Sequence, residues 1–394
     1  MNRFVGTTVR GIRTPIIKQG DDLVPIVTDS LMKAAEYNNI EFRDRDVIAV
    51  TESLVARAQG NYVTTEDIAK DIADKFPDEI GIVFPILSRN RFSIILKGIA
   101  ESKRKIHILL SYPADEVGNH LIAPEALYQS DVNPYSDVLD EEEFRKTFGD
   151  LKHPFTQVDY VALYREICGD TPVEIHFAND PRAILNYTKD VLVAEVHTRN
   201  RTKKILEDTG VNKIYTLDDI CTKPGKTGGY NPEYGLLGSN LAGKSMVKLF
   251  PRDSQKFVEI LQEKLVEITK KNIEVMVYGD GAFKDPAGKI WELADPVVSP
   301  GHTKGLIGTP NEIKIKYIAD NELAGMSGEE AIQKMKEKIN EKSEDLSDSD
   351  EALGTTPRNL TDLLGSLSDL TSGSGDKGTP VVWIQGYFDS YASE

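Results

Sequence analysis

The apolar run that most constrains the fold is TPVVWIQG at residues 379–386. Its β-branched and aromatic residues are typical of a buried strand. Because this run comes so late in the sequence, the last part of the chain must return into a sheet built mainly from earlier residues. We therefore predict that the acidic, serine-rich stretch 341–357 is an internal lid or linker rather than a tail. Residues 362–378, which contain several glycines and serines, are expected to form a flexible loop.

Further apolar runs indicate a mixed α/β, or α+β, fold. The run DVIAVTES at 46–53 is typical of a buried strand, and ARAQGN at 56–61 is expected to be the polar loop that leaves it. In the segment 121–214 and at its end, VEIHF, KDVLVAEVH and KIYTL have the character of strands and alternate with helical stretches. This alternation predicts a small α/β subdomain at 121–214, inserted into a core made of residues 1–120 and 215–394.

The acidic composition argues against several classes of partner. The chain has 394 residues and a formal net charge of −16, which repels nucleic acid and anionic membranes. We therefore expect neither as a partner, and any bound phosphate must be held locally or through a cation. Cys168 and Cys221 lie far apart without metal-ligand spacing, and the first residues lack the apolar stretch of a signal peptide. The sequence thus predicts a cytoplasmic protein.

A glycine-rich stretch, YNPEYGLLGSNLAGKS at 230–245, carries polar side chains suited to binding an anion. Its glycines allow the backbone to approach a ligand closely, and Ser239, Asn240 and Lys244 can reach toward phosphate or carboxylate. Downstream, the apolar run IEVMVYGD ends at Asp280, which its strand would hold rigidly. The two features together predict a nucleotide site, with an anion-binding loop beside a metal-binding carboxylate.

Residues 238–245 also satisfy the phosphate-loop pattern, in which four residues separate a glycine from Gly-Lys-Ser. That motif needs a buried strand immediately before it and a helix that opens at the lysine. Here the preceding residues are rich in turn formers, and Pro251 follows too soon for a helix. The context therefore argues against a phosphate-loop enzyme.

Several other charged residues are candidates by position. Glu52, Ser53 and Arg57 follow the strand at 46–53, where ligands commonly bind in open α/β sheets. Asp285 follows Asp280 in a loop rich in carboxylates, whose oxygens suit Mg²⁺ or Mn²⁺. Three further residues are weaker candidates for an anion: Arg89, Arg91 and His120. Three further histidines lack metal-ligand spacing and are expected to be packed or solvated: His153, His176 and His197.

Four separated segments, in this order, resemble the gamma-glutamyl ligase family of the deazaflavin coenzyme F420. That family uses GTP and a divalent metal to join L-glutamate to a lactyl-phospho-deazaflavin. The segments are RTPIIKQGDDL (13–23), VTESLVARAQGN (50–61), YGLLGSNLAGKS with LFPRDS (234–254), and GSGDKGTPVVWIQG (373–386). The resemblance implies a ligase core with mixed sheets, GTP or ATP as co-substrate, Mg²⁺ or Mn²⁺ as cofactor, and a homodimer.

The resemblance also implies roles for individual residues. Asp280 matches a metal-binding aspartate that follows a strand. Residues of the first three segments would line the nucleotide: Thr14, Pro15, Ile16, Glu52, Ser53, Arg57 and Asn240. To these we add Ser239 from the glycine-rich stretch and Asp376 from the last segment.

The chain departs from the family pattern at the metal site. The first metal aspartate of the family falls on Leu237, and Gly281 stands where a hydroxyl is expected. Arg57 replaces a lysine, which keeps the charge but changes its geometry. Leucine cannot ligate a metal, so a second ligand would have to come from another carboxylate: Glu233, Asp285 or Asp376. The chain is thus identified as a divergent member with a large insertion, and its acceptor need not be the deazaflavin.

These features predict a nucleotide- and metal-dependent amide ligase that activates a carboxylate as an acyl phosphate for attack by an amine. Asp280 and Arg57 would carry the catalysis by positioning and by stabilising charge. The small-molecule partners would be a nucleotide, a glutamate-like amino acid and an anionic acceptor. The alternative is a repurposed, non-catalytic protein that binds a nucleotide or an anionic metabolite.

Overall fold

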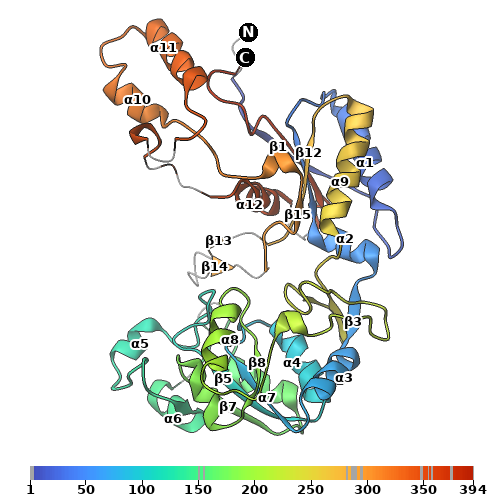
Figure 1. Ribbon diagram of the computed structural model, residues 1–394, viewed down its shortest axis with the longest axis vertical. Coiled ribbons are helices and arrows are strands. Elements are labelled where there is room, and N and C mark those ends of the chain that lie inside the picture. Colours follow the sequence, from blue (N-terminus) through green and yellow to red (C-terminus); the bar gives the residue numbers. More distant parts are fainter. Residues whose placement is uncertain are drawn as a thin grey trace.

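The protein has two lobes, each built around its own β-sheet, and a small third sheet lies between them (Figure 1). The first lobe contains both the earliest and the latest residues, whereas the second comes from the middle of the sequence. The fold is mixed α/β, as the sequence predicts. The computed structural model describes residues 4–149, 151–153, 156–280, 283–284, 291–292, 296–346, 349–353, 355, 358–372 and 376–393.

The first lobe contains a mixed five-stranded sheet in the order β1-β16-β2-β12-β15. Strands β2 and β12 are parallel, and the other neighbouring pairs are antiparallel. All five residues of β16 are buried, and β16 lies between β1 and β2, which confirms that the late apolar run returns into the main sheet. The strands are β1 (Thr8–Ile12), β2 (Val47–Thr51), β12 (Glu274–Tyr278), β15 (Gly301–His302) and β16 (Val381–Gln385).

Helices cover both faces of this sheet because strand side chains alternate between the faces. Ile48 and Val50 belong to the apolar cluster that includes α1 (Leu23–Asn38) and α9 (Ser254–Thr269). Val47 and Ala49 belong to the cluster on the opposite face, which includes two leucines of α12 (Leu360–Ser372). The sheet is therefore buried on both sides.

Two stretches that were expected to be loops are helical. Residues 56–59 belong to α2 (Glu52–Gln59), which begins directly after β2 and ends where Gly60 adopts a positive φ. Most of the segment 362–378 belongs to α12. Its glycines and serines suggested a loop, but Leu360, Leu364 and Ser368 recur every four residues and are all buried. Burial of this face against the sheet outweighs the low helix propensity of glycine and serine.

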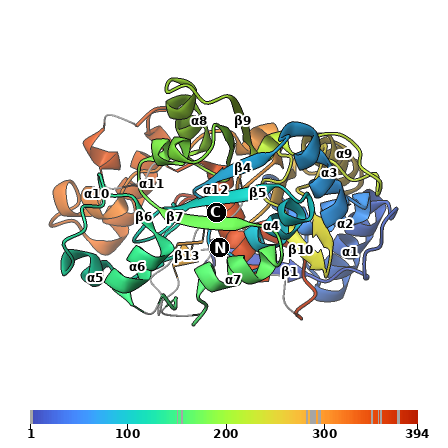
Figure 2. The same ribbon diagram turned by 90° about the horizontal axis from the view of Figure 1, so that it is seen from below.

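The second lobe contains a six-stranded sheet in the order β6-β7-β5-β4-β8-β9, parallel except for β6 (Figure 2). One face packs in a cluster with α3 (Thr65–Lys75), α4 (Phe92–Glu101) and α7 (Tyr160–Cys168). The other face packs with the 3-10 helix η1 (Pro181–Asn186) and α8 (Arg199–Glu207). The strands are β4 (Glu79–Val83), β5 (Lys105–Leu110), β6 (Leu139–Asp140), β7 (Val173–Phe177), β8 (Asp190–Val193) and β9 (Lys213–Thr216).

This sheet extends beyond the segment 121–214 that the sequence suggested as an inserted unit. Strands β4 and β5 precede residue 121, yet they lie at the centre of the sheet. A division between residues 120 and 121 would separate them from the strands with which they pair.

The third sheet contains β3 (Tyr62–Thr64), β10 (Asn240–Gly243) and β11 (Met246–Lys248). Strands β10 and β11 form an antiparallel hairpin, and Lys244 and Ser245 form its turn. The lysine of the phosphate-loop pattern therefore lies in a hairpin turn and does not open a helix. This geometry excludes a phosphate loop at residues 238–245.

The remaining elements are short or peripheral. Helices α10 and α11 pack against each other through a small cluster that includes Ile318, Met335 and Ile339. Across the described parts of the chain, no helix has the length and apolar character needed to span a bilayer. These elements are α5 (Pro124–Tyr128), α6 (Glu141–Phe148), η2 (Leu217–Asp219), β13 (Phe283–Lys284), β14 (Trp291–Glu292), η3 (Lys304–Leu306), α10 (Ile315–Asn321), α11 (Gly328–Glu341) and η4 (Asp350–Ala352).

Asp115 fixes the loop between β4 and α4 from within the second lobe. Its buried carboxylate accepts hydrogen bonds from the backbone amides of Leu87 at 2.8 Å and Asn119 at 2.8 Å. The Val117 amide and the Asn119 side chain donate two more, at 3.1 and 2.7 Å. Burial raises the pKa of Asp115 to about 6, although these hydrogen bonds oppose the rise.

Replacement of Asp115 by Asn should therefore change how stability depends on pH. Between the ordinary pKa of 3.8 and the raised value of about 6, the folded wild type binds more protons than the unfolded chain. The free energy of unfolding of the wild type thus falls as pH rises. The Asn side chain does not titrate, so this fall is absent in the variant. From pH 4 to pH 8 the free energy of unfolding of the variant should rise by about 2.4 kcal/mol relative to that of wild type. Denaturant unfolding at several pH values measures this difference.

The control is Asp137→Asn, because hydrogen bonds from the Asn133 amide and the Ser136 hydroxyl lower the pKa of exposed Asp137. The free energy of unfolding of this variant, relative to that of wild type, should therefore fall as pH rises. A difference for Asp115→Asn that does not vary with pH would show that Asp115 titrates normally.

Candidate functional site

Several predicted segments meet at one edge of the five-stranded sheet. The carboxyl ends of β1, β2 and β12 and the amino end of β16 lie at this edge, because Ile12 pairs with Val381, and Val381 pairs with Val50. Thr51, at the end of β2, pairs with Tyr278, at the end of β12. The edge therefore collects the segment that begins at residue 13, the start of α2, Asp280 and the turn that contains Asp376. Ligands commonly bind at such edges in α/β folds.

Glu52 begins α2 at this edge, and its side chain is buried. The Lys248 ammonium lies 3.5 Å from Glu52 Oε1 and also donates a hydrogen bond to the Ser53 hydroxyl. The Thr51 hydroxyl donates to Glu52 Oε2 at 3.2 Å. Burial raises the pKa of Glu52, the charge of Lys248 partly offsets the rise, and the negative charge of Asp280 adds to it. The pKa of Glu52 thus depends on charges from two other segments, those of Lys248 and Asp280.

Asp280 forms an ion pair with Arg91, which precedes α4 in the second lobe. The Arg91 side chain is 11% exposed and that of Asp280 40% exposed, so the pair is partly shielded from water. Such shielding strengthens the attraction between the two charges. The ion pair therefore joins the edge of the first sheet to the loop that Asp115 holds in place.

A pocket of about 460 Å³ opens beside this group. Arg57 and Lys248 contribute positive charges to it, and Ser53 and Asn240 contribute a hydroxyl and an amide. The Arg57 side chain is held by its own hydrogen bond, in which Nε donates to the Ile17 carbonyl at 2.6 Å. Two cations beside neutral donors suit a phosphate or carboxylate group. The lining residues are Gln19, Ser53, Arg57, Tyr62, Asn240, Leu241, Ala242, Met246 and Lys248.

Asn240 and Asp280, which the sequence predicts to share a site, are connected through short contacts. Asn240 pairs with Lys248 across the β10–β11 hairpin, and Lys248 contacts Glu52. The next residue after Asn240 donates its amide to the Asn90 carbonyl at 2.7 Å, directly before Arg91, the partner of Asp280. The segment of Asn240, on the third sheet, and the segment of Asp280, after β12, therefore lie near the same edge of the five-stranded sheet.

The N-terminal residues assigned to the nucleotide do not line the pocket beside Arg57. Thr14 and Pro15 line a separate hollow of about 910 Å³, which also includes Arg10 and Arg13. Ile16 is 83% exposed, and it is not among the residues that line either hollow. The pocket beside Arg57 and the hollow beside Thr14 are thus distinct.

The proposed compensating carboxylates are exposed where the structure describes them. Glu233 is exposed in the turns before β10, and Asp376 is exposed in the turn before β16. Asp285 lies outside the described residues. Leu237, where the resemblance places a metal aspartate, is 1% exposed and belongs to the main apolar cluster of the second lobe. Glu52 contacts Lys248, which lines the pocket, and Asp280 contacts Arg91.

Ser239 and Lys244 have different surroundings from those the glycine-rich stretch suggested. Ser239 is buried, and its hydroxyl makes no hydrogen bond to any of the described residues. Lys244 is exposed, and its carbonyl accepts a hydrogen bond from the Lys97 ammonium at 2.9 Å. Ser239 can thus still meet a small polar ligand, whereas Lys244 projects from a surface turn.

Sequence reasoning missed Lys248 and ranked Arg91 among the weaker candidates. Lys248 lies between Val247 and Leu249, both of which are buried. This apolar–polar–apolar alternation is the available signal, because it places the lysine on the other face of a short strand. Arg91 carries no comparable signal, since its partner lies 189 positions away in the sequence.

Comparison with known proteins identifies the family to which the chain belongs. A family model described as F420-0:gamma-glutamyl ligase matches residues 11–386. The chain is also similar to the coenzyme F420:L-glutamate ligase of Methanosarcina acetivorans, with 32% identity over 84 residues, which are 20% of this chain and 30% of the relative. The match thus covers less than a third of that relative's length. Because the family model spans nearly the whole sequence, the chain belongs to the F420-0:gamma-glutamyl ligase family, a family of ligases.

Proposed function

We propose that the protein is a nucleotide- and divalent-metal-dependent amide ligase. The observation that carries this proposal is the pocket in which Arg57 and Lys248 meet the sheet edge that bears Glu52 and Asp280. Cations suited to phosphate and carboxylates suited to a hard metal ion are the two requirements of phosphoryl transfer. Membership of a ligase family supports this assignment.

The residues present fit a magnesium or manganese ion in chemical type. Glu52 and Asp280 supply carboxylate oxygens, which both ions prefer as ligands. When bound there, such an ion would neutralise the negative charge of nucleotide phosphates. Lys248 and Arg91, which now balance Glu52 and Asp280, would then be able to interact with the phosphates directly.

The proposed reaction has two steps. A carboxylate oxygen of the acceptor attacks the terminal phosphorus of GTP or ATP, which gives an acyl phosphate and releases the nucleoside diphosphate. The amine of a glutamate-like amino acid then attacks the acyl carbon, loses a proton and displaces phosphate. Arg57 and Lys248 would hold the transferred phosphoryl group, and Asn240 would hydrogen-bond the nucleotide.

A binding protein without catalysis is the competing proposal, and the burial of Leu237 favours it. A buried leucine cannot replace a metal ligand, so the site contains fewer carboxylates than the family pattern. Calorimetry with GTP and ATP, with and without Mn²⁺, separates the two proposals. Binding that requires metal, with phosphate release on addition of glutamate and a carboxylate acceptor, supports the ligase. Binding that is independent of metal and gives no turnover supports the binding protein.

Asp280→Asn should abolish metal-dependent phosphate release. The amide keeps the shape of the side chain but removes the negative charge that would bind the cation, and we expect a loss of about 100-fold or more. The measurement is phosphate release from GTP and from ATP with Mn²⁺. Asp44→Asn is the control, because Asp44 precedes β2 and so lies at the opposite edge of the same sheet. Unchanged turnover in Asp280→Asn would remove Asp280 from the site.

Lys248→Met should weaken nucleotide binding, whereas Lys244→Met should leave it unchanged. Lys248 lines the pocket, so loss of its charge should weaken binding by about 10- to 100-fold, as is usual for a charged hydrogen bond. Lys244 lies in the exposed hairpin turn, so its variant should bind as wild type does. Titration calorimetry measures both dissociation constants. The reverse result would restore the phosphate-loop interpretation and exclude the pocket.

A further inference from the structure

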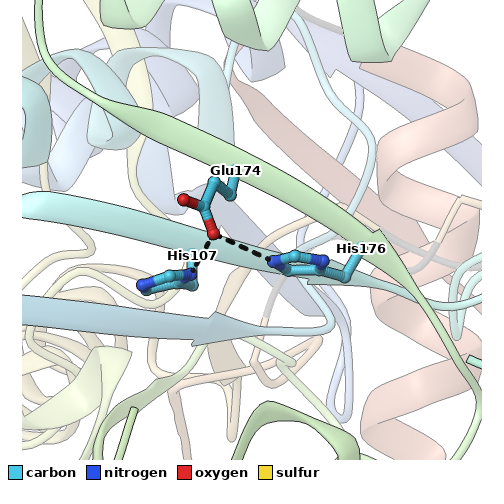
Figure 3. A group of neighbouring side chains, drawn as sticks. All are labelled: His107, Glu174 and His176. Atoms are coloured by element: carbon cyan, nitrogen blue, oxygen red, sulfur yellow. Dashed lines mark ion pairs between the residues drawn. The ribbon is translucent and has the colours of Figure 1, made fainter. Parts of the chain in front are cut away.

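Two histidines and a glutamate lie together on the second lobe's sheet, away from the pocket described above. His107 is on β5, and Glu174 and His176 are on the neighbouring parallel strand β7. Figure 3 shows the Glu174 carboxylate between the two imidazole rings, with one of its oxygens directed toward a nitrogen of each ring. The group lies on the sheet face covered by η1, in the middle of β5 and toward the end of β7, beside an apolar cluster on the same face.

The imidazole nitrogens lack hydrogen bonds. The His107 and His176 residues are only 2% and 5% exposed. Within the described parts of the chain, none of their four ring nitrogens has a hydrogen-bond partner. Buried polar groups are normally satisfied, because leaving them unpaired costs free energy. The two adjacent buried rings thus face carboxylates without making well-directed hydrogen bonds, and their nitrogens are able to bind a ligand such as a metal ion.

The geometry is close to that of a metal site. Glu174 Oε2 lies 3.3 Å from His107 Nδ1 and 3.8 Å from His176 Nε2. One ligand atom from each residue lies within 4.8 Å of the other two. Zinc binds nitrogen and oxygen at about 2.0–2.2 Å, so tetrahedral ligands are separated by about 3.4 Å. The Glu174 side chain is 48% exposed and can move, so small side-chain shifts are sufficient to close the site.

We propose that His107, Glu174 and His176 bind a divalent transition-metal ion of the zinc type. Two imidazoles and one carboxylate are a ligand set that suits Zn²⁺, whereas Mg²⁺ and Ca²⁺ prefer oxygen ligands alone. Three protein ligands would leave a fourth tetrahedral position for water or another ligand. No other group of three such residues with this spacing occurs among the residues that the structure describes.

Neighbouring groups support the ring orientations. Glu79 Oε2 lies 3.6 Å from His107 Nε2, on the nitrogen that would not bind the ion. A carboxylate in this position typically orients a metal-binding histidine. The Tyr187 ring stacks on His176 with centroids 3.6 Å apart and an interplanar angle of 11°, which restricts rotation of that ring.

The charges around the group permit a cation. Lys105 lies 2.8 Å from Glu174 Oε1 and opposes a metal ion, but Glu79, Glu174 and Asp140, the residue opposite His176 on β6, are negative. Burial lowers the pKa of His176 to about 4, and burial also lowers the pKa of His107.

Such an ion would join the middle of β5 to β7. None of the residues that line the candidate ligase pocket belongs to β5 or β7, so the two sites are separate. The ion would therefore act on the stability of the second lobe rather than on ligation. This inference does not depend on the proposed ligase activity.

The experiment titrates the full-length protein, freed of metal by a chelator, with Co²⁺ and follows the visible absorption of four-coordinate cobalt. We expect one Co²⁺ per chain, displacement by Zn²⁺, and a higher melting temperature with Zn²⁺ than with the chelator. His107→Phe and His176→Phe retain an aromatic ring and should lose the absorption bands. Glu174→Gln, whose side chain is half exposed and whose folding is least at risk, should weaken Zn²⁺ binding by at least 10-fold.

Two controls make the result specific. His197→Phe removes an exposed histidine of the same lobe and should bind Co²⁺ as wild type does. Asp280→Asn should also keep the bands, so failure of the ligase proposal and failure of the metal proposal can be distinguished. The proposal is overturned if the wild type gives no four-coordinate bands, if Glu174→Gln binds Zn²⁺ as tightly as wild type, or if Zn²⁺ leaves the melting temperature unchanged.

Discussion

The pairing of β2 with β12 determines where the candidate site lies. Their parallel register brings Thr51 opposite Tyr278, so the residues that follow the two strands, Glu52 and Asp280, emerge at one edge. The opposite end of β2 is fixed by buried Asp46, whose carboxylate accepts hydrogen bonds from Trp383 Nε1 at 2.9 Å and Gln385 Nε2 at 2.8 Å. Because a slip of one residue would turn every side chain to the other face, this buried network and the two apolar faces define one register.

The second lobe contributes to the same edge through contacts of a different kind. Arg91 reaches Asp280 from a loop whose conformation depends on the Asp115 carboxylate, and the β10–β11 hairpin presents Lys248 to Glu52. Each basic residue comes from a segment outside the five-stranded sheet, and each acidic residue comes from its edge. The positions of Lys248 and Arg91 thus depend on how the hairpin and the second lobe pack against the first lobe, whereas Arg57 on α2 and the two carboxylates belong to the first lobe itself.

The sequence predicted the features that rest on local patterns. Apolar runs identified β2, β12 and β16, and the position of β16 in the middle of a sheet followed from its burial. It was wrong about α12, because glycine and serine obscured a buried face that only tertiary packing reveals. Lys248 and Arg91 could not be assigned, since their roles come from contacts across 196 and 189 residues. His176 was dismissed and His107 was not considered, because the two become neighbours through strand pairing and not through spacing in the sequence.

The central place of β16 has a consequence for how the protein is made. This strand is the last of the five-stranded sheet to leave the ribosome, yet β1 and β2 hydrogen-bond to it from both sides. Until it emerges, β1 has no neighbour in the sheet and one edge of β2 stays open, and open edges invite pairing with other chains. The second lobe is continuous in sequence and can assemble earlier during translation. Nascent chains are therefore most exposed to aggregation between synthesis of the second lobe and release of β16.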